Sequence, residues 1–113
     1  MRRPSIRTQL LKGTTPLLVL TVLRDTELYG YEIAQRIRER SGGAFAPSEG
    51  SLYPALHRLE KQGWVTSQWK QTESNQRAKF YRLTPAGKRQ LLTEQTRWAQ
   101  IVSAIAGIMS TEC

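Results

Sequence analysis

The chain has 113 residues, enough for one small domain with an appendage. Its 17 lysines and arginines against 9 acidic residues give a net charge of +8, which favours a polyanionic partner, nucleic acid or anionic lipid. No apolar run is long enough to cross a bilayer, and no apolar segment with a cleavage site follows the basic N-terminus, so we expect neither a membrane span nor a secretory signal. The single cysteine, at the last position, excludes an intrachain disulfide framework and favours a cytoplasmic location.

The first predicted helix spans about residues 9–24, where apolar side chains recur densely enough for a buried helix. Residues 1–8 before it are basic and are either a solvated tail or an arm that contacts DNA. Pro16 would be tolerated in a first turn that a preceding threonine caps. In that case residues 10–11 form a short lead-in segment ahead of the helix.

A second helix is predicted over about residues 29–41, after a short turn at residues 25–28. Its inward stripe begins with Tyr29 and continues with aliphatic residues, while arginines lie on its outer side. Gly42-Gly43 ends it, because glycine adopts the positive φ of a helix stop at little cost.

The third predicted helix lies at about residues 48–62, in the run S-E-G-S-L-Y-P-A-L-H-R-L-E-K-Q-G. Ser48 is a good N-cap and Gly63 a good stop. Pro54 is unusual inside a helix, because its ring clashes with the carbonyl four residues earlier. The helix therefore either bends at Pro54 or begins nearer Ser51.

The polar face of this third helix is small at its start, at Gly50 and Ser51, and basic further along. Small side chains allow close approach, and cations favour a negative partner. A helix that enters a major groove by its N-terminal turn has these properties. Together with the preceding helix and turn, the segment predicts a helix-turn-helix.

After Gly63 the periodicity changes to that of strands, which predicts a β-hairpin over about residues 64–83 with a polar turn between its strands. A hairpin alone is marginally stable, so it should lie against the helices. Arg77, Lys79 and Arg82 then either contact the DNA backbone as part of a wing or form a solvated edge that discourages aggregation.

Thr84-Pro85 is a strong start signal for a last helix, which can run to about Met109 because no breaker occurs before Gly107. Its apolar residues repeat as in a coiled-coil seam, at Leu91, Trp98, Ile101, Val102, Ile105, Ile108 and Met109. A small domain cannot cover a helix of this length, so we expect a second copy of the chain to cover it in a homodimer. Folding back onto its own domain is the alternative for Leu91 and Leu92.

Catalytic chemistry has little support, because the chain contains one histidine and one cysteine. The sequence has no carboxylate pair at glycosidase spacing, no glycine-rich phosphate loop and no soft metal-ligand set. We therefore expect no enzyme activity, no cofactor and no metal. His57 is expected to be a polar surface or DNA-facing residue.

Four ordered runs resemble the PadR family of bacterial transcriptional regulators: L-K-G-T-T-P-L-L-V-L-T-V-L, L-Y-G-Y-E-I-A, the third helix, and K-F-Y-R-L-T-P-A-G. The resemblance implies a mostly helical α+β fold, with a winged helix-turn-helix at residues 1–84 and a dimerisation helix at residues 85–113. It also implies that G-S-L-Y-P begins the recognition helix, that Arg77 and Lys79 belong to the wing, and that Trp98 lies where some relatives line a ligand pocket. A small aromatic or hydrophobic effector is a candidate partner.

The expected function is that of a sequence-specific DNA-binding repressor near its own or a neighbouring promoter. A two-fold dimer places recognition helices in major grooves about 34–36 Å apart, so the operator should be an imperfect palindrome. We expect contacts to base edges or adjacent phosphates from Ser48, Gly50, Ser51, Tyr53, Pro54 and His57, and contacts to phosphates from Arg58, Lys61, Arg77 and Lys79. The alternatives are a winged module that binds protein and a small-molecule or metal sensor.

Overall fold

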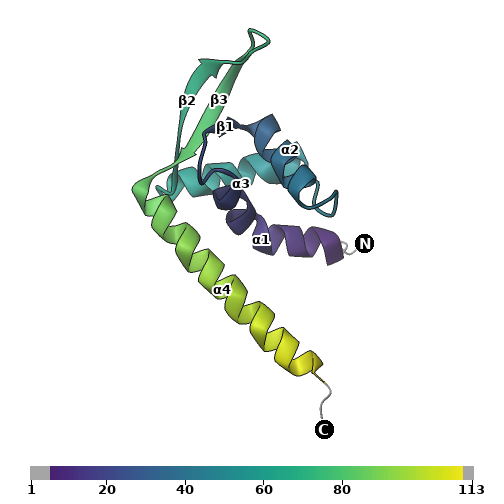
Figure 1. The fold of residues 1–113 in the computed structure, drawn as a ribbon. Helices are drawn as coiled ribbons and strands as arrows, with labels where there is room; N and C mark the ends of the chain where they lie inside the picture. Colours follow the sequence, from purple (N-terminus) through teal and green to yellow (C-terminus); the bar gives the residue numbers. More distant parts are fainter. Residues whose placement is uncertain (1–5, 111–113) are drawn as a thin grey trace.

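The computed structural model describes residues 6–110, with only the backbone described for residues 6–13. Most of the predicted N-terminal arm therefore lies outside the described residues. In order, the elements are α1 (Ile6–Val22), β1 (Leu28–Tyr29), α2 (Gly30–Arg40), α3 (Glu49–Lys61), β2 (Val65–Gln71), β3 (Arg77–Leu83) and α4 (Pro85–Met109). Figure 1 shows three helices grouped below a projecting β2–β3 hairpin, with α4 running away from them in the opposite direction.

The core is formed where α1, α2 and α3 meet under the base of the sheet. Its most buried side chains include Leu20, Ile33, Leu52 and Leu56, each at most 1% exposed. A three-stranded antiparallel sheet of order β1-β3-β2 closes it, through Val65, Tyr81 and Leu83 among others. The predicted helix-turn-helix and hairpin are thus packed into one unit, as a marginal two-stranded hairpin requires.

The prediction for the first helix was wrong at Pro16. Helix α1 begins at Ile6, so Pro16 lies inside it and residues 10–11 are not a separate lead-in. An interior proline removes one backbone hydrogen bond. The fully buried Val19 and Leu20 that follow it supply packing that offsets this cost.

A short strand that the sequence reasoning missed lies where the predicted turn at residues 25–28 meets the second helix. Leu28 and Tyr29 form β1 and pair with Tyr81 and Phe80 of β3, and α2 begins one residue later than predicted, at Gly30. The Tyr29 N–H donates to Glu32 Oε1 at 3.3 Å, which satisfies one free backbone group at the start of α2. Two residues are too few to show a strand periodicity, so no local signal indicated β1.

Helix α3 begins at Glu49, so the alternative start nearer Ser51 was wrong. Ser48 is the N-cap, and its Oγ accepts the Ser51 N–H at 3.3 Å. Pro54 lies inside the helix. The predicted stop is confirmed, because the chain leaves α3 through Gly63 with a φ of +79°.

The start of α4 is attached to the turn between α3 and β2. Thr84 caps the helix by accepting the Gly87 N–H at 3.0 Å, and its hydroxyl donates to the Gly63 carbonyl at 2.6 Å. Gly87 lies so close to the backbone that a Cβ there would be 1.9 Å from the Trp64 carbonyl oxygen. The direction in which α4 leaves the domain is therefore fixed at its first turn.

Candidate nucleic-acid interface

Helix α3 is buried on one face and exposed on the other. Leu52, Ala55, Leu56 and Leu59 face the core. All the residues of α3 and its cap that were predicted to contact DNA are exposed, namely Ser48, Gly50, Ser51, Tyr53, Pro54, His57, Arg58 and Lys61. Their exposure leaves them accessible to a duplex, and their contact with DNA stays a prediction.

The first turn of α3 is small and already hydrogen-bonded within itself. The Ser51 hydroxyl donates to the Ser48 carbonyl at 3.1 Å, while the Ser48 hydroxyl lies 3.3 Å from Ser51 Oγ. A helix N-terminus with short side chains can approach a phosphate closely, and its dipole favours the negative charge.

Tyr53 is oriented by a glycine of the preceding helix. A Cβ on Gly30 would lie 2.6 Å from the Tyr53 hydroxyl oxygen, so only glycine allows this tyrosine to lie against the start of α2. Tyr53 is nevertheless 43% exposed. A cleft between α2 and α3 continues from this contact along Tyr31 and Arg38. Sequence reasoning did not predict that residues of α2 line this cleft. The sequence signal for it was the glycine in L-Y-G-Y, which allows the close approach of Tyr53.

The hairpin has an inner and an outer face. Its strand register pairs Ser67 with Tyr81 and Trp69 with Lys79, and cross-strand partners point to the same side. We call the side that contacts α3 the inner wing face, comprising Ser67, Trp69, Arg77, Lys79 and Tyr81. The opposite side is the outer wing face, comprising Lys70, Phe80 and Arg82. The two predicted wing contacts, Arg77 and Lys79, are thus both on the α3 side.

Glu60 joins α3 to the inner wing face. Its carboxylate accepts the Ser67 hydroxyl at 2.6 Å and pairs with Lys79 Nζ at 3.5 Å. Burial raises the pKa of Tyr81, and Glu60 adds to the shift. Lys79 was predicted to contact phosphate, but its ammonium is already paired within the protein and its side chain is only 37% exposed.

Arg77 is exposed and lies next to an exposed aromatic ring. Its guanidinium carbon is 5.5 Å from the centre of the Trp69 ring, within the range of a cation–π contact. Trp69 itself is 58% exposed. The stacking orients the Arg77 side chain while leaving its charge accessible to an anion.

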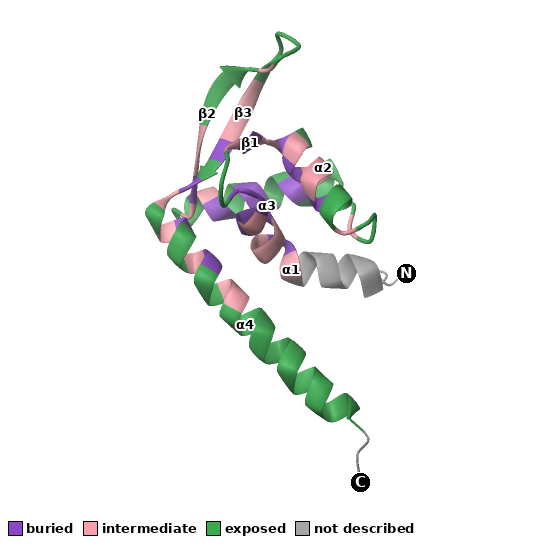
Figure 2. Cartoon of the chain, in the orientation of Figure 1, coloured by how far each residue is buried: buried purple, intermediate pink, exposed green. Residues whose placement is uncertain are grey.

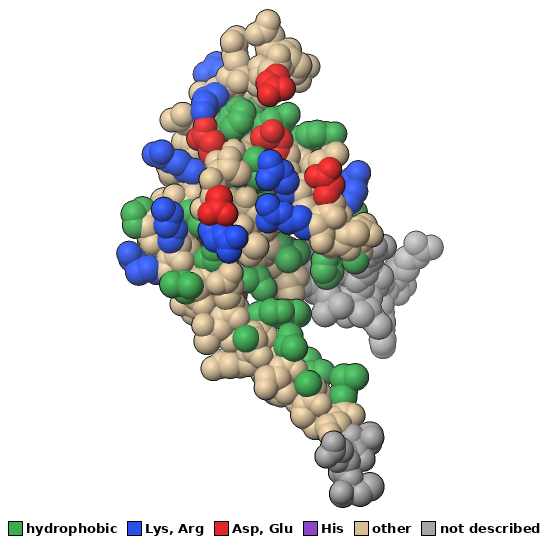
Figure 3. Space-filling view, in the orientation of Figure 1, with side chains coloured by type: hydrophobic (Ala, Val, Ile, Leu, Met, Phe, Trp, Pro, Cys, Tyr) green, Lys and Arg blue, Asp and Glu red, His purple; other side chains and the backbone are tan. Residues whose placement is uncertain are grey.

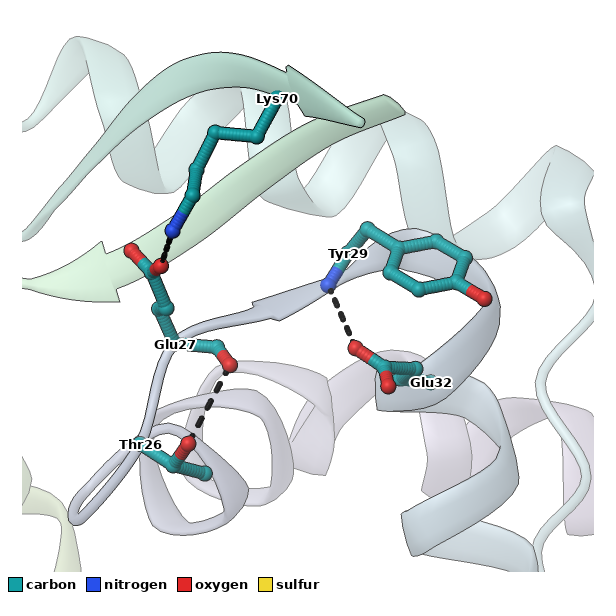
Figure 4. A network of polar contacts seen from close by, with 5 residues as sticks. All are labelled: Thr26, Glu27, Tyr29, Glu32 and Lys70. Atoms are coloured by element: carbon teal, nitrogen blue, oxygen red, sulfur yellow. Dashed lines mark hydrogen bonds and ion pairs between the residues drawn. The ribbon is translucent and has the colours of Figure 1, made fainter. Parts of the chain in front are cut away.

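On the outer wing face, Lys70 forms an ion pair with Glu27, which precedes β1 (Figure 4). The Lys70 ammonium also lies 5.2 Å from the centre of the Phe80 ring. Figure 4 shows the Glu27–Lys70 contact beside the Tyr29–Glu32 hydrogen bond at the start of α2. Lysine–glutamate pairs therefore connect the wing to the rest of the domain on both of its faces.

The distal half of α4 is uncharged and exposed. Residues 98–109 contain no charged side chain, and Figure 2 shows this part of the helix as exposed throughout. In Figure 3 the lysines, arginines and acids gather over the winged part, while hydrophobic side chains follow α4 towards its end. The exposed apolar residues are Trp98, Ile101, Val102, Ile105, Ile108 and Met109.

Leu91 was predicted to belong to the same seam, and this was wrong. Leu91 is 4% exposed and lies in the chain's own core cluster, because the first turns of α4 pack against α1. The alternative of folding back therefore applies to Leu91. It does not apply to Leu92, which is 65% exposed.

Trp98 lines an apolar pocket between α4, α1 and the end of α2. The pocket has a volume of about 340 Å³. Its lining residues are Leu17, Leu18, Thr21, Val22, Ile37, Arg40, Ser41, Phe45 and Trp98. A space of this size and lining suits a small hydrophobic group.

Within residues 6–110, no helix combines the length and apolarity needed to cross a bilayer. Across this same range, histidine, cysteine, aspartate and glutamate side chains nowhere form a group of three suited to a metal ion.

Comparison with known proteins identifies the family. A model of the transcriptional regulator PadR-like family matches residues 19–93. A transcriptional regulator of Mycobacterium tuberculosis is 32% identical over 96 residues, which cover 85% of this chain and 86% of that protein. The negative transcriptional regulator PadR of Bacillus subtilis is 32% identical over 73 residues, or 65% of this chain and 40% of that protein.

A solved structure gives the same result for the fold. The crystal structure of a PadR-like transcriptional regulator from Bacillus cereus aligns with a TM-score of 0.79 at 29% identity, covering 92% of this chain and 99% of that one. This match confirms the predicted winged helix-turn-helix fold. The predicted absence of enzyme activity is confirmed by the family, which is one of non-enzymatic transcriptional regulators. The chain belongs to the PadR-like family of transcriptional regulators.

Proposed function

We propose that the chain is a cytoplasmic, homodimeric repressor that binds an imperfect palindrome near its own or a neighbouring promoter. The observation that carries the DNA-binding part is the joint exposure, on one side of the domain, of the α3 polar face and the inner wing face. Repression is supported by the resemblance to the relative from Bacillus subtilis, which is named as a negative regulator.

The DNA contacts follow from where the exposed groups lie. In this proposal α3 enters a major groove by its N-terminal turn, with Ser48, Ser51, Tyr53, Pro54 and His57 near base edges or adjacent phosphates and Gly50 allowing close approach. Arg58, Lys61 and Arg77 contact phosphates. Phosphate contacts supply affinity and salt dependence, whereas only base contacts and DNA shape can distinguish sequences.

Dimerisation through residues 98–109 would cover the exposed seam of α4. Burying one such apolar side chain stabilises an interface by roughly 1.5–3 kcal/mol, and a symmetric dimer buries each one twice. Two recognition helices held about 34–36 Å apart would fit successive major grooves, which is why we propose a palindromic operator.

The pocket at Trp98 supports a second part of the proposal. A small aromatic or hydrophobic effector would bind there and release the repressor from DNA. The pocket shares Trp98 with the proposed dimer seam. A ligand that binds there would change DNA affinity only if it prefers one spacing of the two recognition helices. Quenching of Trp98 fluorescence by planar aromatic compounds, in a variant with Trp64 and Trp69 replaced by phenylalanine, tests this element.

Selection of bound sites from a random duplex pool tests the proposed function. We expect an enriched palindrome, and a shift of the same duplex in a gel. A protein-binding winged module would enrich no sequence.

Tyr53→Ala should lower the preference for the selected site over random duplex, with a loss of about 1–3 kcal/mol confined to the selected site. Arg58→Ala should weaken binding to both duplexes alike. Equal losses on both duplexes for Tyr53→Ala would remove Tyr53 from the base readers.

A further inference from the structure

Glu60 carries a negative charge on the side of the domain that the proposed function assigns to DNA. It lies on α3 between the exposed Arg58 and Lys61, and it faces the inner wing face. A carboxylate in this position repels phosphate, so its presence calls for a physical explanation beyond solubility.

The contacts of Glu60 provide that explanation. One carboxylate oxygen accepts the Ser67 hydroxyl at 2.6 Å, and the other pairs with Lys79 Nζ at 3.5 Å. The Lys79 ammonium is also 5.7 Å from the centre of the Tyr81 ring, which holds it further towards the base of the wing. The ion pair with Glu60 therefore engages the Lys79 ammonium, which would otherwise be available to a phosphate.

We propose that Glu60 is a positioning residue that holds the wing against α3 and keeps Lys79 from phosphates, which limits binding to sequences other than the operator. The inference rests on the proposed DNA-binding function. The Glu60 and Lys79 side chains are 31% and 37% exposed, so their pair is weak in itself. Its influence comes from location, because in the proposed complex the Glu60 charge lies on the side of the domain that faces the phosphates.

The chain provides a matched control on the outer wing face. Glu27 and Lys70 form a comparable pair, with side chains 30% and 41% exposed. Glu27→Gln removes the same charge as Glu60→Gln and also releases a wing lysine. The released lysine, however, lies on the side of the wing away from α3.

The experiment measures affinity for a random-sequence duplex as a function of salt. For Glu60→Gln we expect roughly three- to tenfold tighter binding near 0.1 M salt, and a slope of log affinity against log salt steeper by about 1.8, the value for two added phosphate contacts, one from each subunit of the proposed dimer. Glu27→Gln should leave the slope unchanged. In the double variant Glu60→Gln with Lys79→Gln, the slope should return to the wild-type value.

Two further variants separate positioning from folding. Lys79→Gln alone should leave the wild-type slope unchanged, because Lys79 is held by Glu60 and not by phosphate. Ser67→Ala keeps the ion pair and should also keep the slope. In Glu60→Gln the preference for a selected operator over random duplex should fall severalfold.

The proposal is overturned if Glu60→Gln behaves like Glu27→Gln, or if the steeper slope survives the loss of Lys79. It is also overturned if Lys79→Gln alone lowers the wild-type slope by about 1.8, a result that does not depend on whether Glu60→Gln folds. Failure of the proposed function itself looks different, because selection with the wild-type protein would then enrich no sequence from the random duplex pool.

Discussion

In the winged part of the chain, Leu20, Leu52 and Leu56 are at most 1% exposed, whereas Ile105, Ile108 and Met109 near the end of α4 are 49%, 82% and 72% exposed. Both sets are large aliphatic side chains on helices. The first set lies where three helices and a sheet meet, so one chain buries it completely. The second lies on a single helix that extends past every other element (Figure 2).

The difference shows how far along α4 the chain buries its own apolar side chains. On α4 the change falls between Leu91, which the chain's own core covers, and Trp98, which is 45% exposed. Charge changes at the same point, because Arg97 is followed by a run without charged residues over positions 98–109. An uncharged apolar helix face that the chain itself leaves open favours association with another copy.

Ile105→Glu should have the largest effect on this comparison. It places a carboxylate in the proposed seam twice per dimer, and we expect dimerisation to weaken by at least about 3 kcal/mol, because two buried side chains are lost. Chemical cross-linking at micromolar protein should show a single subunit, with the far-ultraviolet circular dichroism unchanged. Gln100→Glu is the control, since this exposed residue lies on another side of α4. Equal effects of the two variants would contradict the seam.

Leu56→Ala tests the buried region of this comparison, the core of the winged part. Leu56 is 0% exposed, and removing its side chain should lower the free energy of unfolding by about 2–5 kcal/mol through lost burial and a new cavity. Leu92→Ala, at a 65% exposed position of α4, should change it by no more than about 0.5 kcal/mol. Urea denaturation of both variants measures the difference. Similar losses would mean that Leu92 is covered in solution.

Arg77→Ala should have the smallest of these effects. It should change DNA affinity and leave dimerisation and folding unchanged. Removing one phosphate contact from each subunit of the dimer should lower the slope of log affinity against log salt by about 1.8 on any duplex. Arg82→Ala removes the same charge from the outer wing face and should leave the slope nearly unchanged. Titration of a fluorescent duplex at several salt concentrations compares them. If the two variants lower the slope alike, the inner wing face is not the one that faces DNA.

Elements that carry local signals could be predicted from the sequence. Ser48 and Thr84 are N-caps whose hydroxyls accept the expected backbone N–H groups, and Gly63 adopts the positive φ expected of a helix stop. The end of α4 at Met109 also agrees with the prediction. Such signals act within a few residues, so one sequence is sufficient to find them.

Features that depend on distant residues could not be predicted in this way. Strand β1 exists because β3 pairs with it, and α1 continues through Pro16 because the residues beyond it are buried by other helices. In the candidate site, the Tyr53–Gly30 contact and the Glu60–Lys79 pair join positions that only the fold brings together. Leu91 kept the spacing of a seam residue, and only the packing of α4 against α1 shows that it is a core residue.

Sedimentation equilibrium of the wild-type chain tests the central claim most directly, because it requires no operator and no effector. The proposed dimer through residues 98–109 predicts about twice the chain mass of 12.9 kDa at micromolar concentration. A mass of one chain throughout that range would contradict the account, since the apolar face of α4 would then stay exposed to water without a partner.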